Sequence, residues 1–268
     1  MMDQNQAPTH ITGSLAGKVA LVTGSSRGIG AGIARSFAAY GAMVSIHGID
    51  LEEGRVVAAS IRQSGGTAIA LEGDLKDEAQ CRDLIHDTLR EFGQLDILVN
   101  NAAIYPRGAI ETTTVALWDE VFATNLRAPF ILCQEAVAHM KPRNSGCIIN
   151  IGSVNGVFGL PKLLAYSSSK GGLTTLTKNL SNSMTEHRIR VNQINPGWVL
   201  TEGERHIQTM VEKRGENWLE EIVKTRPFGR MLLPEDIARA ALFLATSPLI
   251  TGAIIDYDQL PVGAPHEF

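Results

Sequence analysis

Residues 19–30 read VALVTGSSRGIG and carry the strongest single indication of the architecture. A short apolar run leads directly into Gly24, Gly28 and Gly30, and an amphipathic segment follows. A strand, a glycine-rich turn and a helix N-terminus can together bind a pyrophosphate, because glycine lets the backbone approach the phosphates and the helix end offers free N–H groups. No Gly-Lys-Ser/Thr follows, so the motif is not a P-loop. Glycines also serve turns that bind nothing, so the interpretation depends on the rest of the chain.

Short apolar runs alternate with longer amphipathic segments on the C-terminal side of this stretch. Further runs typical of buried strands lie at 42–47, 67–73, 95–102, 146–153, 188–197 and 251–257. Helices are expected at 28–40, 51–64, 77–92, 114–141, 163–186 and 235–246. Strands that alternate with helices imply right-handed crossovers. We therefore predict an α/β fold with a Rossmann-like, doubly wound parallel β-sheet of about seven strands and helices on both faces.

Length and composition favour one large domain. The chain has 268 residues, of which 44% are apolar and 19% charged, and this is enough to bury a sizeable core. We predict a flexible N-terminal arm at 1–14 and a single domain at 15–268. The long excursion at about 198–231 is expected to be a substrate loop or lid, since long connections in compact domains usually bind or cover ligands.

The composition also argues against several classes of protein. A net charge of −4 gives no basis for binding nucleic acid or an anionic membrane. No apolar run approaches the ~20 residues that span a bilayer, and the first residues lack the features of a secretory signal. The cysteines Cys81, Cys133 and Cys147 have no metal-site spacing. We expect reduced thiols, no metal site and a cytoplasmic location.

Polar or small residues follow several of the predicted strands. They are Asp74, Asn101, Ser153 and the pair Pro196-Gly197. Ligands of doubly wound sheets bind outside the carboxyl ends of the strands, so these residues are expected to meet at one crevice. Any one of them alone would fit an ordinary loop.

Tyr166 and Lys170 lie four residues apart, so on a helix they share one face. A phenol has an ordinary pKa of ~10, and a nearby cation lowers that pKa. Tyr166 could then exchange a proton with a substrate hydroxyl or carbonyl while a nicotinamide carries the hydride. Ser153 could orient the same oxygen, and its surroundings lack the G-x-S-x-G turn of many serine hydrolases. A solvated helix can also carry such a Tyr/Lys pair by chance.

Taken together, these motifs resemble those of the short-chain dehydrogenase/reductase family in its single-domain form. The resemblance extends over about residues 15–258 and includes the glycine motif, Asp74, NNA at 100–102, Asn125, Ser153, the Tyr166/Lys170 pair, and Pro196-Gly197 with Thr201. Ala103 stands where the family usually has glycine, and Gln259-Leu260 replace the usual Gly-Gly near the end. These departures leave the catalytic motif unchanged.

The resemblance implies an NAD(P)-dependent oxidoreductase that interconverts a secondary alcohol and a ketone or aldehyde. The implied catalytic residues are Asn125, Ser153, Tyr166 and Lys170. Tyr166 would be the general acid/base, Lys170 would lower its pKa and bind the nicotinamide ribose, and Asn125 would hold a relay water. The implied cofactor-binding residues are Gly24, Ser26, Arg27, Gly28, Ile29, Gly30, Asp50, Asp74, Leu75, Asn101, Ala102, Ala103, Tyr166, Lys170, Pro196, Gly197, Val199 and Thr201.

The choice between NAD and NADP stays open, with a slight preference for NAD. Gly48 and Ile49 occupy the positions that usually discriminate. Asp50 could accept a hydrogen bond from the adenine-ribose 2′-hydroxyl, whereas Arg27 could pair with a 2′-phosphate.

The expected substrate is a small polar molecule such as a sugar, polyol or hydroxy acid. Asn155 and Trp198 are expected to join Ser153 and Tyr166 in binding it. Two alternatives remain, namely a reductase of apolar steroid or acyl carbonyls and a noncatalytic nucleotide-binding or scaffolding protein on the same fold. By resemblance, the helices at 114–141 and 163–186 would form an interface, and we predict a homotetramer or a dimer.

Overall fold

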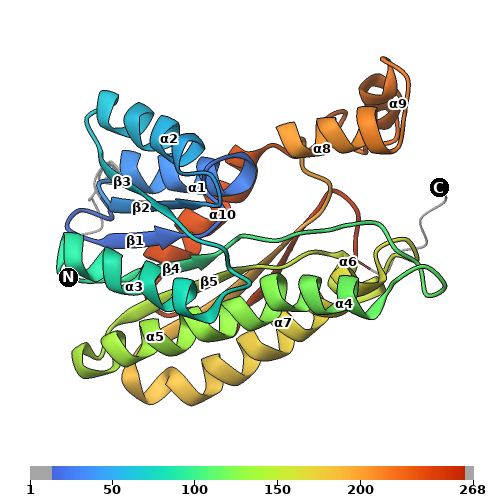
Figure 1. Ribbon diagram of the computed structural model, residues 1–268. Coiled ribbons are helices and arrows are strands. Elements are labelled where there is room, and N and C mark those ends of the chain that lie inside the picture. Colours follow the sequence, from blue (N-terminus) through green and yellow to red (C-terminus); the bar gives the residue numbers. More distant parts are fainter. Residues whose placement is uncertain (1–13, 263–268) are drawn as a thin grey trace, which may run out of the picture.

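The computed structural model describes residues 14–262. Within that range, seven parallel strands form one sheet in the order β3-β2-β1-β4-β5-β6-β7 (Figure 1). They are β1 (Val19–Val22), β2 (Met43–Gly48), β3 (Thr67–Glu72), β4 (Ile97–Asn100), β5 (Gly146–Ile151), β6 (Ile189–Pro196) and β7 (Ile254–Tyr257). The order reverses between β1 and β4, the usual position of a ligand in such sheets. Residues 1–13 of the predicted arm and the tail beyond 262 lie outside the described residues.

Helices cover both faces of the sheet, which confirms the predicted fold class (Figure 1). One face carries α1 (Gly28–Ala39), α2 (Leu51–Gln63) and α10 (Pro234–Thr246), and the other carries α3 (Glu78–Phe92), α5 (Ala128–Arg143) and α7 (Leu164–Met184). Shorter helices are α4 (Val115–Phe122), α6 (Asn155–Phe158), α8 (Glu202–His206), α9 (Trp218–Lys224) and the 3₁₀ turn η2 (Thr185–His187). No helix among the described residues is long and apolar enough to cross a membrane.

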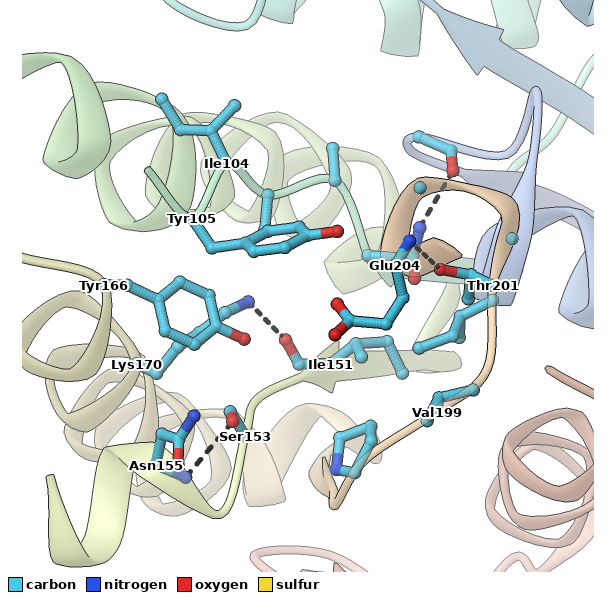
Figure 2. A pocket seen from close by; sticks show the side chains of 18 of the residues that line it. Ile104, Tyr105, Ile151, Ser153, Asn155, Tyr166, Lys170, Val199, Thr201 and Glu204 are labelled. Atoms are coloured by element: carbon cyan, nitrogen blue, oxygen red, sulfur yellow. Dashed lines mark hydrogen bonds between the residues drawn. The ribbon is translucent and has the colours of Figure 1, made fainter. Parts of the chain in front are cut away.

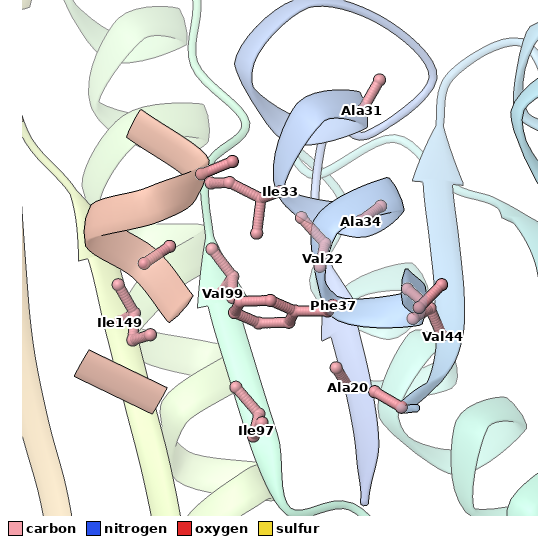
Figure 3. Packing of buried hydrophobic residues seen from close by; sticks show 14 of the residues in the cluster. Ala20, Val22, Ala31, Ile33, Ala34, Phe37, Val44, Ile97, Val99 and Ile149 are labelled. Carbon is pink, nitrogen blue, oxygen red and sulfur yellow. The ribbon is translucent and has the colours of Figure 1, made fainter. Parts of the chain in front are cut away.

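Alternating side chains of the buried strands supply two separate cores. On β1, Ala20 and Val22 pack with α1, whereas Leu21 faces α3 and α5. Figure 3 shows the first core, in which Phe37 of α1 lies over the sheet near Val99 of β4. Because successive strand residues point to opposite faces, a sheet buried on both sides needs a continuous apolar run. This two-sided burial fixes the strands and aligns their carboxyl ends.

Two segments have a secondary structure that the sequence analysis did not predict in detail. The helix predicted at 114–141 is interrupted by a π-helical turn, η1 (Ala123–Arg127), between α4 and α5. Asn125 lies in this turn, and its side chain bonds to the backbone of Ile104 in a neighbouring loop. Single π-helical turns often occur at functional sites. The excursion at 198–231 contains α8, the π-helical turn η3 (Ile207–Val211) and α9, and these are raised away from the sheet (Figure 1).

Candidate active site

A cavity of about 1030 Å³ opens at the carboxyl ends of the strands. Most of the residues implicated by the sequence line it: Gly24, Ser26, Arg27, Gly28, Ile29, Asp50, Asp74, Leu75, Asn101, Ala102, Ala103, Ser153, Asn155, Tyr166, Lys170, Pro196, Gly197, Trp198, Val199 and Thr201. Gly30 and Asn125 are not part of the lining; they contact Gly24 and Ile104, which are. The strand ends therefore do bring distant segments of the chain to one cavity.

The glycine loop between β1 and α1 is shaped for close backbone contact. Gly24 and Gly28 have φ values of 60° and 57°, which favour glycine. A Cβ on Gly30 would lie 2.4 Å from the carbonyl oxygen of Gly24, so no side chain fits there. The first turn of α1 has neither a side-chain cap nor an acidic residue, so its N–H groups are available to an anion. These features fit the pyrophosphate of a dinucleotide.

Asn101, at the end of β4, supports this loop from below. Its amide nitrogen donates to the carbonyl oxygens of Thr23 at 2.9 Å and Gly24 at 3.0 Å. A Cβ on Gly24 would lie 2.8 Å from the Cα of Ala102, so the two segments are in close contact. Ala103 keeps a negative φ, since the described non-glycine residues with positive φ are Asn144, Arg188 and Lys213. The turn therefore accepts alanine in place of glycine without strain.

His47 of β2 is a site residue that the sequence analysis missed. The backbone N–H of Gly24 donates to its Nδ1 at 3.0 Å, and its Nε2 lies 3.0 Å from the carbonyl oxygen of Gly73. Because a carbonyl can only accept, the imidazole is neutral with its proton on Nε2. Burial lowers the pKa of His47, against an opposing hydrogen bond to Gly73. The available signal was a single histidine at the end of the apolar run at 42–47.

Charged side chains gather beyond the end of β2, where adenine-ribose specificity is expected. Asp50 caps α2, because its Oδ1 accepts from the backbone N–H groups of Glu52 and Glu53. Glu53 also accepts from the Ser26 hydroxyl at 3.1 Å and lies 3.7 Å from the Arg27 guanidinium. Asp50 is thus partly used as a helix cap, and Glu53 is a second carboxylate that the sequence analysis overlooked. Its position three residues after Asp50, on the first turn of a helix, was the signal.

Three of the four predicted catalytic residues, Ser153, Tyr166 and Lys170, come from the loop after β5 and from α7 (Figure 2). Ser153 follows β5, and its Oγ accepts from the backbone N–H of Asn155 at 3.1 Å. Tyr166 lies in the first turn of α7, and Lys170 follows one turn later. The Lys170 Nζ donates to the carbonyl oxygen of Ile151 at 2.7 Å and lies 5.8 Å from the centre of the Tyr166 ring. A phenol, a hydroxyl and an amine therefore share one wall of the cavity.

Burial governs the proton affinities of this group in the polypeptide alone. Desolvation raises the pKa of Tyr166 to about 12, while a hydrogen bond with Ser153 opposes the rise and the charges of Tyr105 and Glu204 add to it. Desolvation lowers the pKa of Lys170 to about 7. The expectation that Lys170 lowers the pKa of Tyr166 is therefore not met in the polypeptide alone, because the buried amine is itself only partly charged near neutrality.

The side chain of Asn125 is bonded to two neighbouring segments of the chain. Its Oδ1 accepts from the backbone N–H of Ile104 at 2.9 Å, and its Nδ2 donates to the Ile104 carbonyl at 2.8 Å and the Ser169 hydroxyl at 3.1 Å. The side chain is thus used in holding the segment that presents Tyr105 to the cavity. The Tyr105 ring meets the Tyr166 ring edge to face, with centres 5.9 Å apart.

The unusual C-terminal residues also contribute to this side of the molecule. Gln259 donates to the carbonyl oxygen of Arg230 at 2.6 Å and accepts from the backbone N–H of Phe228 at 3.1 Å. Asp258 packs so closely against Gly197 that a Cβ there would lie 2.2 Å from its carboxyl carbon. Leu260 lines the cavity. The departure from Gly-Gly thus ties the last loop to the excursion at 198–231.

Comparison with known proteins gives a consistent picture. A family model described as short chain dehydrogenase matches residues 18–212. An uncharacterized oxidoreductase of Thermotoga maritima is 38% identical over 244 residues, which cover 90% of this chain and 96% of that relative. A 3-oxoacyl-(acyl-carrier-protein) reductase of Chlamydia trachomatis is 35% identical over 251 residues, covering 92% and 98%. A proposed NAD(P)-dependent gluconate 5-dehydrogenase from Beutenbergia cavernae, solved with NADP at low occupancy, is 31% identical with a TM-score of 0.84, covering 94% and 98%.

The family match and the geometry agree in detail. The glycine loop, the uncapped N-terminus of α1 and the Ser153–Tyr166–Lys170 group lie in one cavity, as hydride transfer to or from a nicotinamide requires. The relatives match across nearly their whole length. The chain is an enzyme of the short-chain dehydrogenase/reductase family, the NAD(P)-dependent oxidoreductases.

Proposed function

We propose that the enzyme interconverts a secondary alcohol and its ketone or aldehyde, with Tyr166 as the group that transfers the proton. The observation that carries this proposal is the position of the Tyr166 hydroxyl beside Ser153 in a cavity that also holds the glycine loop. Ser153 orients the reacting oxygen and stabilises charge that develops on it. When bound, the nicotinamide supplies or accepts the hydride.

Lys170 has two roles in this proposal. Its amine is buried and fixed by the Ile151 carbonyl, so it can donate to ribose hydroxyls without losing its position. It also provides the positive charge that Tyr166 needs when it accepts a proton during alcohol oxidation. With a pKa near 12 in the polypeptide alone, Tyr166 is protonated at neutral pH and ready to act as the acid in carbonyl reduction.

The direct test is Tyr166→Phe, which keeps the ring and removes the hydroxyl. Turnover of alcohols and carbonyls, followed by the absorbance of the reduced nicotinamide, should fall by about 10²–10⁴-fold, since general acid–base catalysis contributes that much. Cofactor affinity, followed by fluorescence of the reduced nicotinamide, should stay close to that of the wild type. Tyr40→Phe, at the end of α1 and outside the cavity lining, is the matched control. Near-native turnover by the Tyr166 variant would contradict the assignment.

Two other functions stay in view as outcomes of the same screen. If no alcohol or carbonyl is turned over while a dinucleotide binds, a noncatalytic nucleotide-binding or scaffolding role becomes the better description. If only apolar carbonyls are turned over, the substrate class of the enzyme is closer to that of the acyl reductase among its relatives. Two observations argue against both alternatives: Ser153, Tyr166 and Lys170 line one cavity, and polar and charged side chains line it with them.

We propose NAD as the preferred cofactor. The carboxylates of Asp50 and Glu53 line the cavity beyond the end of β2, Arg27 is paired with Glu53, and Ile49 offers no charge. Two acids favour a hydroxyl over a phosphate. The ratio of kcat/KM for NAD over NADP should exceed about tenfold, a difference of one charge-assisted hydrogen bond. A preference for NADP would show that Arg27 leaves Glu53 to bind the phosphate.

The proposed substrate is small and polar, such as a sugar, polyol or hydroxy acid, bound by Ser153, Asn155, Tyr166 and Trp198. The support is that all four line the cavity and that Ser153, Asn155 and Tyr166 carry donors or acceptors, while Trp198, whose Nε1 donates to Glu204, contributes its ring. We propose the cytoplasm as its location, because Cys81, Cys133 and Cys147 are all buried free thiols.

A further inference from the structure

Glu204 of α8 is a buried carboxylate at the catalytic end of the cavity. Its side chain is 9% exposed and lines the cavity. Its Oε1 accepts two hydrogen bonds, from Trp198 Nε1 at 2.8 Å and from Gln208 Nε2 at 2.7 Å. Among the described residues 14–262, no group donates a hydrogen bond to Oε2. One oxygen is therefore fixed, and the other is left to accept from a ligand.

The charge of the Glu204 carboxylate affects the pKa of the nearby tyrosines. Figure 2 shows it pointing toward the space beside the Tyr105 and Tyr166 rings. After burial, which is the main cause, the charge of Glu204 contributes to raising the pKa of Tyr105 and of Tyr166. A charge that influences the Tyr166 hydroxyl also influences a substrate whose oxygen is bound to it. Groups close to the reacting carbon thus meet a fixed negative charge.

The other charges of the cavity lie on residues that are already partly neutralised or exposed. Arg107 pairs with Glu212 at 2.9 Å, and Arg226 packs over the Trp198 ring at 5.7 Å. The remaining charged lining residues outside the glycine loop and the segments that follow β2 and β3 are Glu120, Lys162, Lys170, Arg214 and Asp258. Over the whole lining the seven basic residues equal the seven acidic ones, so the cavity has no net charge that would attract an ion of either sign. Glu204 disfavours an anion near the reacting carbon, so a neutral hydrogen-bond donor fits both conditions.

We propose that Glu204 determines substrate specificity by accepting a hydrogen bond from a hydroxyl next to the reacting carbon. The substrate is then a neutral polyhydroxy compound, and a hydroxy acid with its carboxylate near that carbon is excluded. A site built to bind a hydroxyl rejects analogues that lack it, because its buried acceptor is left unpaired. This inference rests on the proposed function and narrows its substrate class.

The test compares neutral polyols with aldonates of equal chain length, using wild type, Glu204→Gln and Glu202→Gln. Glutamine keeps the shape and an acceptor oxygen for Trp198 but removes the charge. For Glu204→Gln, kcat/KM on the polyol should fall about 10- to 100-fold, the loss of one hydrogen bond to a charged group, while kcat/KM on the aldonate stays constant or rises. Glu202 is exposed on the same helix and outside the cavity lining, so its variant should leave both values unchanged.

Several outcomes would overturn the inference. An equal loss on both substrates, with a lowered melting temperature, would assign Glu204 a structural role alone. A wild-type preference for the aldonate, or for simple apolar alcohols, would overturn it even if Glu204→Gln failed to fold. Both outcomes leave the oxidoreductase assignment intact. If wild type turned over no alcohol or carbonyl with either nicotinamide cofactor, the proposed function itself would fail.

Discussion

Lys170 shows how one residue can be costly for folding and necessary for catalysis. Lys170 is 2% exposed, and its amine is buried in α7 at the wall of the cofactor cavity. Taking an ammonium out of water costs several kcal/mol unless it is paired, and its main partner here is a neutral carbonyl. The pKa of about 7 is the expression of that cost.

We predict that Lys170→Met stabilises the protein while it removes activity. The pKa of Lys170 is about 7 when folded and 10.5 in the unfolded chain. The unfolded state therefore binds the proton more tightly between these values, and stability falls as the pH drops from about 10.5 to about 7. Methionine removes this penalty, so the free energy of unfolding at pH 7 should rise by about 1–3 kcal/mol. Thermal melts measure it.

The gain should shrink as the pH rises toward the ordinary pKa of lysine, because the wild-type amine is then neutral in both states. Lys178→Met is the matched control, since Lys178 is exposed on the same helix and should show no such pH dependence. A lower melting temperature for Lys170→Met at neutral pH would mean that the bond to Ile151 outweighs the desolvation. Normal cofactor affinity in that variant would remove the ribose role proposed for Lys170.

At the scale of elements, His47 joins three segments that meet at the cofactor site. It belongs to β2, accepts from the glycine loop after β1 and donates to Gly73 after β3. The same arrangement recurs elsewhere, since Asn125 in η1 ties α4 and α5 to the Ile104 segment. In both cases a buried polar side chain fixes a loop whose backbone has no partner in the sheet.

We predict that acid weakens cofactor binding through His47. Its folded pKa is lowered below the unfolded value of 6.5, so the neutral imidazole contributes stability that is complete above that pH and is lost as the pH falls through the folded pKa. A protonated Nδ1 can no longer accept from Gly24. Wild-type stability and dinucleotide affinity should therefore decline together below pH 6.5, as measured by thermal melts and titration calorimetry.

His47→Asn supplies the comparison, because asparagine offers Gly24 an acceptor and does not titrate. For this variant, stability and dinucleotide affinity should depend less on pH below 6.5 than they do for the wild type. Identical pH profiles for the two proteins would show that other groups cause the acid effect. The asparagine variant should also lose some stability at neutral pH, since the bond to Gly73 is removed, by about 0.5–1.5 kcal/mol.

At the scale of the whole molecule, one face outside the catalytic cavity has the character of an interface. A groove between α4, η1, α5 and α7 is lined by Asp119, Phe122, Ala123, Leu126, Arg127, Phe130, Gly172, Thr175, Leu176 and Asn179. Phe130 is 49% exposed there, and Trp118 stacks on Phe122 nearby. Small residues next to exposed aromatics allow two copies of a helix pair to approach closely.

We therefore predict a homotetramer, or at least a dimer, built on this face. Phe130→Asp should shift the mass measured by light scattering toward a smaller species, because an unpaired carboxylate would be buried in the interface. Val56→Asp is the control, since Val56 is exposed on α2 and lies outside the groove. A wild-type monomer at micromolar concentration would exclude the prediction.

The sequence by itself determined the elements, their alternation and the family. Strand and helix periods, the glycines at 24, 28 and 30, and the spacing of Ser153, Tyr166 and Lys170 are local properties, so they can be read from neighbouring residues. The seven predicted strands and the two-faced parallel sheet are confirmed. The π-helical turn at Asn125 was not predicted, and the partner of its side chain is the backbone of Ile104, 21 residues away in the sequence.

Tertiary structure alone decided the electrostatics of the site. Tyr166 and Lys170 have spacing that suggests a lowered phenol pKa, yet burial raises that pKa to about 12 and lowers that of the amine to about 7. From the sequence, Glu204 would be expected to be an exposed surface charge. In the fold it is a buried carboxylate in the cavity. The physical reason is that desolvation depends on atoms contributed by the whole chain, whereas a sequence pattern reports only which residues are near along it.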